Sequence, residues 1–369
     1  MRIYWKYSRR RSVLPVCAFL CLFANCSFFG TTNSHPEYAL FAIAFPRAEP
    51  RFVYVGNNNS NNVSIYAVNR ETGTLTLSGS MAAAGGPYGL TVDPTASFVY
   101  VSGFTSGNVS MFSLNQGSGN LTSLGTIASG TNAYNIAIDR SGTLAYVANN
   151  GASNVSIFAI DRTNGNLVSK GTTGAATNPF GVATDPSARF LYVVNYGSDS
   201  VSMYTIQSNG LLNSNGTIGT GTNPCGIYVE PRGRFAYVAN SNSVNLSMYT
   251  INPAGGLNAN GTAPSGTGPY ALAGDSAGLF VYGVNITSGN VSMYAINQTT
   301  GTLNSLGTIA AASGSSGITV DPNGRYVYVS NLVANVVSSF IIDPATGALQ
   351  ANGSIASGTS PYGISIAYY

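Results

Sequence analysis

Seven copies of one unit of about 45 residues make up most of the chain, and this repetition restricts its fold more than any other feature. Aligned on the segment "FVYV", neighbouring copies are 46, 46, 46, 45, 45 and 46 residues apart. The copies begin at Phe52, Phe98, Leu144, Phe190, Phe235, Phe280 and Tyr326. A period of this length and regularity indicates one supersecondary unit repeated seven times.

Within the copies, three columns of residues keep the same chemical type. The first column is tyrosine throughout: Tyr54, Tyr100, Tyr146, Tyr192, Tyr237, Tyr282 and Tyr328. The second is aromatic: Tyr66, Phe112, Phe158, Tyr204, Tyr249, Tyr294 and Phe340. The third is glycine: Gly73, Gly119, Gly165, Gly210, Gly255, Gly301 and Gly347. Glycine at a fixed place between two apolar runs is typical of a hairpin turn that needs a positive φ angle.

Each copy contains four short runs that suit β-strands. In the second copy these runs are "FVYV", "VSMFSL", "LTSLGTI" and "YNIAI", which are rich in Val, Ile, Tyr and Phe and bounded by Gly, Asn and Pro. No stretch of ten or more residues shows helical spacing. Four strands per unit and a period near 45 predict an all-β protein, a seven-bladed β-propeller with four antiparallel strands in each blade.

The two ends of the repeat region do not match. The first copy starts at the second strand of a blade, Phe52, whereas the chain ends with "SPYGISIAYY" (360–369), which is a first strand. We therefore predict that this strand joins the first blade, beside the strands that start at Phe52, Val63 and Leu75, and closes the ring. The apolar segment "YALFAIAF" (38–45) competes for this place but lacks the Tyr-Gly opening. We expect residues 27–51 to be a linker, which could add an outer strand, and residues 52–369 to form the propeller.

The N-terminus has the order of a secretory leader. The basic run "KYSRRRS" precedes the apolar run "VLPVCAFLCLFANCSFFG", which is short for a membrane span. We predict a signal peptide over residues 1–26. The segment "LFANC" resembles a bacterial lipoprotein box with Cys26 as the lipidated residue, although Asn25 departs from the usual small residue. Simple cleavage is the alternative, and either outcome implies an extracytoplasmic protein, secreted or lipid-anchored in the cell envelope.

Few residues of the chain carry charge. Charged residues make up 7% of it, against about 25% in an average soluble domain. Five of the 15 Lys and Arg residues lie in the first eleven positions, which leaves no basic patch for nucleic acid. Outside the leader there is one cysteine, Cys225, which excludes a disulfide framework and a thiolate metal cluster within the repeats. We expect a monomer without nucleic-acid partners, with a lipid anchor as its one contact with a membrane.

The repeats lack a recognisable set of catalytic residues. The only histidine, His35, precedes them, which excludes a Ser/His/Asp triad within the repeats. Six acidic residues share one column, and an acid repeated beside a turn indicates capping of the backbone. These residues are Asp93, Asp139, Asp185, Glu230, Asp275 and Asp321. We therefore predict no catalytic residues, no metal ligands and no cofactor.

The column just before the glycine of each first strand is the best candidate for a binding site. In a propeller the innermost strands line the central channel, and ligands often bind in its mouth. The column reads Tyr88, Tyr134, Phe180, Cys225, Tyr270, Ser316 and Tyr362. Aromatic rings there could stack on a sugar or another flat ligand, or they could fill the channel as packing. Cys225 and Ser316 break the ring and could open one side of it.

The segments "PYGLTVDP" and "FVYV" and their repeats resemble the lactonase-type seven-bladed propellers, which include 6-phosphogluconolactonase-like and carboxymuconate-lactonizing proteins. The resemblance covers about residues 52–369. It implies the propeller fold, and it implies lactone hydrolysis by polar residues, including His and Arg, near the channel. Because the repeats lack such a set, we interpret the chain as an extracytoplasmic binding or surface scaffold protein without catalysis. Its partner would be a protein or glycan at the channel mouth; the alternative is a lactone hydrolase of the 6-phosphogluconolactonase-like type.

Overall fold

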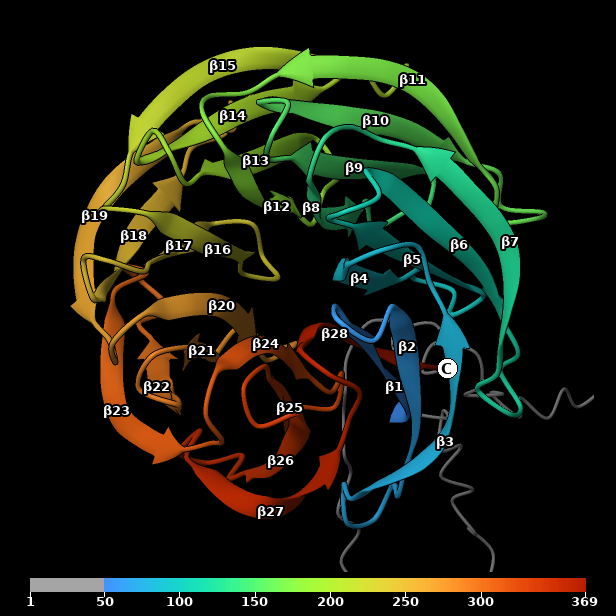
Figure 1. The fold of residues 1–369 in the computed structure, drawn as a ribbon. Coiled ribbons are helices and arrows are strands. Elements are labelled where there is room, and N and C mark those ends of the chain that lie inside the picture. Colours follow the sequence, from blue (N-terminus) through green and yellow to red (C-terminus); the bar gives the residue numbers. More distant parts are fainter. Residues whose placement is uncertain (1–49) are drawn as a thin grey trace, which may run out of the picture. The chain divides into compact units, whose positions relative to one another are not determined.

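Residues 50–369, the part of the chain that the computed structural model describes, fold into twenty-eight β-strands without a helix. The strands pair antiparallel into seven four-stranded sheets, which stand around a central axis as blades (Figure 1). In each blade the first strand lies next to the axis and the fourth lies at the rim. The predicted seven-bladed propeller is confirmed.

In every blade the strands follow one another from the axis outward. Blade 1 contains β28 (Pro361–Tyr368), β1 (Pro50–Asn57), β2 (Asn62–Val68) and β3 (Leu75–Ala82). Blade 2 contains β4 (Pro87–Val92), β5 (Phe98–Gly103), β6 (Asn108–Leu114) and β7 (Leu121–Ala128). Blade 3 contains β8 (Ala133–Ile138), β9 (Leu144–Asn149), β10 (Asn154–Ile160) and β11 (Leu167–Gly174). Blade 4 contains β12 (Pro179–Thr184), β13 (Phe190–Asn195), β14 (Ser200–Ile206) and β15 (Leu212–Gly219).

The last three blades have the same order. Blade 5 contains β16 (Pro224–Val229), β17 (Phe235–Asn240), β18 (Asn245–Ile251) and β19 (Leu257–Pro264). Blade 6 contains β20 (Pro269–Gly274), β21 (Phe280–Asn285), β22 (Asn290–Ile296) and β23 (Leu303–Ala310). Blade 7 contains β24 (Ser315–Val320), β25 (Tyr326–Asn331), β26 (Val336–Ile342) and β27 (Leu349–Ala356).

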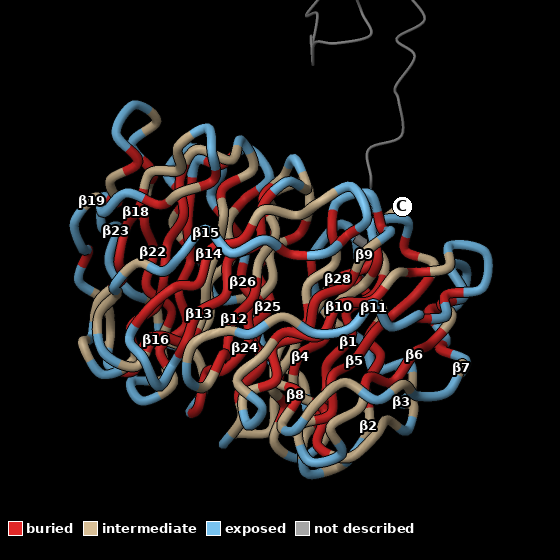
Figure 2. The backbone as a smooth tube through the Cα atoms, turned by 90° about the horizontal axis from the view of Figure 1, so that it is seen from above, coloured by how far each residue is buried: buried red, intermediate tan, exposed pale blue. Residues whose placement is uncertain are grey.

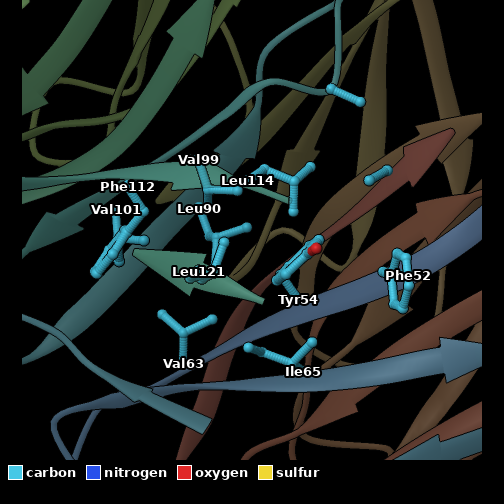
Figure 3. Close-up of a cluster of buried hydrophobic side chains, with 12 residues drawn as sticks. Phe52, Tyr54, Val63, Ile65, Leu90, Val99, Val101, Phe112, Leu114 and Leu121 are labelled. Carbon is cyan, nitrogen blue, oxygen red and sulfur yellow. The ribbon is translucent and has the colours of Figure 1, made fainter. Parts of the chain in front are cut away.

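The hydrophobic core lies between neighbouring blades. The second strand β5 is buried along its whole length, whereas the fourth strand β7 is mostly exposed. Between blades 1 and 2, Tyr54 and Val63 belong to one buried cluster with Leu90 and Val99 (Figure 3). Figure 2 shows the same division across the ring, with buried residues inside and exposed residues at the rim and in the loops. Both faces of "FVYV" are apolar because a neighbouring blade covers each of them.

A hydrogen bond that repeats seven times also joins neighbouring blades. Each tyrosine of the first column donates from its hydroxyl to the carbonyl of a column glycine in the next blade, at 2.8 to 3.3 Å. The pairs are Tyr54 with Gly119, Tyr100 with Gly165, Tyr146 with Gly210, Tyr192 with Gly255, Tyr237 with Gly301, Tyr282 with Gly347 and Tyr328 with Gly73. These tyrosines are fully buried, and a buried hydroxyl needs a partner. The last pair joins blade 7 to blade 1.

The C-terminal strand occupies the place predicted for it. β28 pairs antiparallel with β1, and Val55 lies opposite Ile364. From the neighbouring blade, Ser316 donates a hydrogen bond of 2.8 Å from its hydroxyl to the carbonyl of Pro361. Closure of the ring by the end of the chain is therefore confirmed, and the first blade gains its innermost strand from the opposite terminus.

The acidic column caps the turns that follow the first strands. Oδ1 of Asp185 accepts hydrogen bonds from the backbone N–H groups of Arg189 and Phe190, at 2.7 and 2.6 Å. Ala367 stands at this place in blade 1, where β28 continues one residue further and the chain ends. The acids are therefore parts of the frame, as the sequence indicates.

Several predictions concern residues outside the described part of the chain. They are the signal peptide (1–26) with Cys26, the segment 38–45, and the linker up to residue 49; His35 lies there as well. β1 begins at Pro50, two residues before the predicted start of the propeller at Phe52. None of the elements in residues 50–369 is a helix of the length and apolarity that crossing a bilayer takes.

Candidate functional site

The second residues of the seven first strands meet at one end of the central channel, which we call the mouth. Five of them are aromatic and in mutual contact. The ring centroid of Tyr88 lies 3.9 Å from that of Tyr134 and 4.2 Å from that of Tyr362. The ring of Phe180 lies 4.0 Å from Tyr134 and meets Tyr270 edge-on at 5.5 Å. The fold thus gathers all aromatic members of the predicted column into one cluster.

Hydroxyl groups meet within this cluster. Tyr88 of β4 and Tyr270 of β20 form a hydrogen bond across the channel. Burial raises the pKa of both phenols well above the ordinary value, and it raises the pKa of Tyr134 to about 12. These phenols therefore keep their protons at neutral pH. The cluster offers neutral hydroxyl donors and acceptors on aromatic rings.

A cavity of about 150 Å³ lies on the axis beside the aromatic cluster. It has room for several water molecules, since one water needs roughly 10–15 Å³ of such space. Glycine and apolar residues one or two positions deeper along the strands form part of its wall. Six of the seven column residues complete the wall: Tyr88, Phe180, Cys225, Tyr270, Ser316 and Tyr362. The rings therefore pack against one another and also border a cavity, so packing and binding are compatible.

Cys225 and Ser316 border the cavity but are themselves buried, with exposed fractions of 1% and 3%. Burial raises the pKa of the Cys225 thiol to about 12, so the thiol is protonated and a poor nucleophile at neutral pH. The Ser316 hydroxyl donates its proton to the Pro361 carbonyl. These two departures from the ring therefore shape the cavity, and neither has the features of an activated nucleophile.

Three further residues lie at the mouth that the sequence did not predict there. Phe104 and Tyr196 follow β5 and β13 at equivalent positions and extend the cluster outward. The ring of Phe104 lies 5.3 Å from Tyr134, and that of Tyr196 lies 5.8 Å from Phe180. Asn135 replaces a glycine found in five other copies and borders the cavity. Asn135 departs from a glycine column, and that departure is a signal that could have revealed it. Phe104 and Tyr196 stand in a column whose residue type varies among the blades, and the sequence gives no such signal for them.

Charge is divided unevenly between the two faces of the ring. The mouth face carries the loops before the first strands and after the second strands, and the opposite face, the turn face, carries the other turns. Within residues 50–369, Asp199 is the only charged residue in the loops of the mouth face. The arginines of this same range all lie at the turn face: Arg51, Arg70, Arg140, Arg162, Arg189, Arg232, Arg234 and Arg325. Because the cavity wall also lacks charged residues, the site suits an uncharged ligand.

The cavity wall, as far as the described residues form it, contains no His, Asp or Glu that could serve as a general base. The resemblance noted in the sequence implied His and Arg near the channel, and the wall holds neither. Among residues 50–369, no three His, Cys, Asp or Glu side chains are grouped so that they could hold a metal ion. What the site offers chemically is aromatic surface, neutral hydroxyl groups and one amide.

A family described as "Lactonase, 7-bladed beta-propeller" matches the chain at residues 47–136, 125–225, 213–311 and 307–367. The chain belongs to this lactonase family. The matched segments together run through all seven blades, so membership rests on the whole propeller. It confirms the resemblance carried by the repeat, whose shared residues are those that build blades.

Solved structures share the fold of this lactonase-family chain. A candidate 6-phosphogluconolactonase from Bacteroides uniformis ATCC 8492 is 19% identical, with a TM-score of 0.79 over 86% of this chain and 100% of that one. Another from Bacteroides fragilis NCTC 9343 is 20% identical, with a TM-score of 0.78 over 86% and 98%. The periplasmic gluconolactonase of Pseudomonas aeruginosa is 19% identical, with a TM-score of 0.76 over 85% and 98%. At such identities the likeness shows the fold. A search of curated proteins finds no match.

Proposed function

We propose that this lactonase-family propeller acts on a lactone, which it holds as an uncharged ring in the axial cavity. The observation that carries the proposal is the family match over residues 47–367 in a propeller with a cavity at its mouth. The names of the structural neighbours also support action on a lactone, since two are called 6-phosphogluconolactonases and one is called a gluconolactonase.

The chemistry of the cavity favours a neutral lactone over a phosphorylated one. A phosphate group is normally bound by Arg or Lys side chains or by the N-terminus of a helix. The described residues contain no helix, and no charged residue lines the cavity. Aromatic faces can stack on the apolar face of a sugar ring, while Tyr88, Tyr270 and Asn135 carry groups that can bond its hydroxyls. A sugar lactone without phosphate fits this set.

Hydrolysis of a lactone begins when hydroxide, or water that loses a proton to the solvent, adds to the ester carbonyl and negative charge forms on the carbonyl oxygen. The carbonyl then re-forms as the ring C–O bond breaks, and the ring oxygen takes a proton from solvent water to leave as a hydroxyl group. The hydroxyls of Tyr88 and Tyr270 stay protonated because burial raises the pKa of both, so they suit the role of donors to that oxygen. The cavity wall has no His or carboxylate to take the proton from water, and a missing general base slows a reaction by about 10²–10⁴-fold. We therefore expect slow hydrolysis whose rate rises steadily with pH.

Hydrolysis of D-glucono-1,5-lactone and of its 6-phosphate by the purified protein tests the proposal, with the uncatalysed rate subtracted. We expect a higher kcat/KM for the neutral lactone. A Tyr88→Phe/Tyr270→Phe variant should lose at least about 10²-fold in rate, because a single donor to the oxyanion contributes on this order. Tyr237→Phe removes a hydroxyl that bonds Gly301 between blades, and this control should keep its activity. Equal rates in the double variant and the wild type would refute the site, and no turnover of any lactone would refute the activity.

A second candidate function is binding without catalysis, in a surface or envelope scaffold whose partner is a protein or glycan. The observation that favours it is the lack of His and carboxylate groups in the cavity wall among the described residues. Calorimetric titration with gluconolactone and gluconate separates the two candidates. Binding that the Tyr88→Phe/Tyr270→Phe variant loses, together with a hydrolysis rate no higher than that of buffer, would favour the scaffold.

We also propose that residues 1–26 export the protein and that Cys26 carries a lipid, with simple cleavage as the alternative. The support is the order of basic and apolar runs in the sequence. Expression of the full chain and its Cys26→Ser variant in a bacterial host tests the anchor. The wild type should fractionate with membranes and the variant should not. Equal fractionation would favour cleavage, and gel filtration of the variant should give a monomer.

A further inference from the structure

We propose a second subsite on the mouth face, where the exposed ring of Tyr196 stacks on a further sugar unit of a neutral oligosaccharide whose end unit enters the axial cavity. This inference rests on the proposed function in one respect, which is that the cavity takes a sugar-like ring. It adds the size of the ligand, a chain of at least two or three units, and the residue that recognises its length.

A continuous series of aromatic contacts leads from the cavity to the surface. The centroid distances are 4.2 Å from Tyr362 to Tyr88, 3.9 Å from Tyr88 to Tyr134, 4.0 Å from Tyr134 to Phe180 and 5.8 Å from Phe180 to Tyr196. Exposure rises along the last step, from 8% for Phe180 to 36% for Tyr196. The two rings are close to parallel, at 26°. The cavity and the exposed ring are thus two ends of one aromatic surface.

The loop that carries Tyr196 is fixed by hydrogen bonds to its neighbours. The backbone N–H of Tyr196 donates to the Asn178 carbonyl at 2.9 Å. Asn223 donates from Nδ2 to the Tyr196 carbonyl at 3.2 Å, and from its backbone N–H to Oδ1 of Asp199 at 2.7 Å. The loop therefore loses little freedom when a ligand binds, which favours affinity. Asp199, exposed on the same loop, also offers a carboxylate to sugar hydroxyls.

The position of Tyr196 indicates a role in binding more than in packing. Equivalent positions in the other blades are Asn58, Phe104, Asn150, Ser241, Ile286 and Leu332, so the fold does not require an aromatic ring at this place. Tyr196 does not border the cavity, but its exposed ring stacks on Phe180, which does, and an exposed ring so placed suits a ligand contact. The loops of the mouth face carry no charge within the described residues except Asp199, and this favours an uncharged sugar chain over a charged polymer.

Titration of the full-length protein with neutral oligosaccharides of one to four units, from the cellulose, amylose and chitin series, tests the subsite. In at least one series the affinity of the wild type should rise with length. Tyr196→Ala should lower the affinity for three and four units by about fivefold, since a stacked ring contributes on the order of 1 kcal/mol. It should leave binding of the single unit and any hydrolysis of gluconolactone unchanged, and Tyr196→Phe should bind as the wild type does.

Val333→Ala is the matched control, because Val333 is an apolar residue of the mouth face with 66% exposure. It should change no affinity. The proposal is overturned if no series shows a dependence on length, or if Tyr196→Ala and Val333→Ala have the same effect. It is also overturned if Tyr196 instead mediates self-association, seen as dimers that Tyr196→Ala abolishes in analytical ultracentrifugation. Failure of lactone hydrolysis alone leaves the dependence on length intact, so the two proposals fail separately.

Discussion

At the scale of single residues, two departures from the repeat compensate for each other between β16 and β20. Tyr228 stands in a column of small residues: Thr91, Ala137, Ala183, Ala273, Thr319 and Ser365. Gly274 stands in a column of larger ones: Val92, Ile138, Thr184, Val229, Val320 and Ile366. A Cβ atom on Gly274 would overlap the ring and hydroxyl of Tyr228. The large side chain of one strand therefore occupies the space that the next strand leaves empty.

A double-mutant cycle measures this compensation. Gly274→Val should destabilise the protein by about 1–3 kcal/mol through overpacking, and Tyr228→Ala by about 3–5 kcal/mol through the space it vacates. The double variant restores the residue types that the other blades use, so its loss should be at least 1 kcal/mol smaller than the sum. Urea unfolding of the four proteins provides the values. Strict additivity would show that the two positions do not interact.

The buried phenols predict a loss of stability at alkaline pH. Burial raises the pKa of inter-blade tyrosines such as Tyr192 and Tyr146 above the ordinary value, which is about 10 in an unfolded chain. Unfolded tyrosines therefore lose their protons first, and the contribution of the buried tyrosines to the free energy of unfolding is fully present below pH 10 and falls above it. Urea midpoints at pH 8 and 11 check this, and equal midpoints would contradict it.

The candidate site was only partly predictable at this scale. The aromatic column at Tyr88 could be found because seven aligned copies show which position faces the channel. Phe104 and Tyr196 could not, because each occurs once in a loop position whose residue type varies among the blades. Contact between Tyr88 and Tyr270, which are 182 positions apart, depends on the diameter of the ring. Sequence spacing carries no information about that diameter.

At the scale of elements, each turn between third and fourth strands depends on a glycine for two reasons. The glycine has a positive φ angle, and a side chain of the neighbouring blade occupies the space that a Cβ atom would need. Gly165, between β10 and β11, has a φ of 77°, and a Cβ atom there would overlap the ring of Phe98 in the neighbouring blade. Gly171, within β11, has a φ of 99° but no atom within 4 Å of a Cβ. In this blade, backbone conformation alone requires glycine at Gly171, whereas Gly165 is required by both backbone conformation and lack of space.

Alanine substitutions at these two glycines should differ in effect. Gly171→Ala should cost about 1–2 kcal/mol, because a positive φ is unfavourable for a residue with a Cβ atom. Gly165→Ala should cost a further 1–3 kcal/mol or so, because the methyl group displaces Phe98 and disturbs packing between blades. Denaturant unfolding measures both. Equal losses would mean that the Phe98 ring moves aside without cost.

The strands were the most predictable elements, since seven copies of the same pattern reinforce one another. The shifts in register were not predictable. β10 and β11 pair with an irregularity between Ile157 and Phe158, opposite the stretch that contains Gly171. A bulge of this kind needs one extra residue and a permissive backbone. The only trace of this bulge in the sequence is a second glycine, Gly171, six positions after the turn glycine Gly165.

At the scale of the whole molecule, the two faces of the ring differ in charge. Among residues 50–369, the loops of the mouth face carry one charged residue, Asp199, whereas the turn face carries the arginines, and the described chain enters and leaves on the turn face. β1 begins and β28 ends at the turn face, where the guanidinium of Arg51 lies 4.7 Å from the centre of the Tyr369 ring. The mouth, at the other end of the channel, is therefore free of both ends of the described chain. Neither described end of the chain therefore covers the cavity or Tyr196, and β28 closes the ring from the opposite side.

Removal of the closing strand tests how far the ring depends on it. Deletion of residues 360–369 takes Ile364 and Ile366 out of the core and leaves β1 with an unpaired edge. Loss of about 5 kcal/mol would lower Tm by roughly 5–10 °C, because a domain of this size gains about 0.7 kcal/mol/K of entropy on unfolding. The seven-fold tyrosine bonds would survive, including that from Tyr328 to Gly73 between blades 7 and 1, so the truncated ring should remain β-rich, with a gap beside the axis where β28 lay.

A matched variant that lacks only Tyr368 and Tyr369 keeps the core residues of β28 and should melt close to the full chain. A synthetic peptide with the sequence of residues 360–369, added to the truncated protein, should bind and raise its Tm, because the empty place beside β1 is preformed by the other three strands of the blade. Calorimetric scans with and without the peptide measure both effects. If the protein without residues 360–369 melts like the intact one, the ring is held by its blade-to-blade contacts alone, and β28 is an addition to the fold instead of its closure.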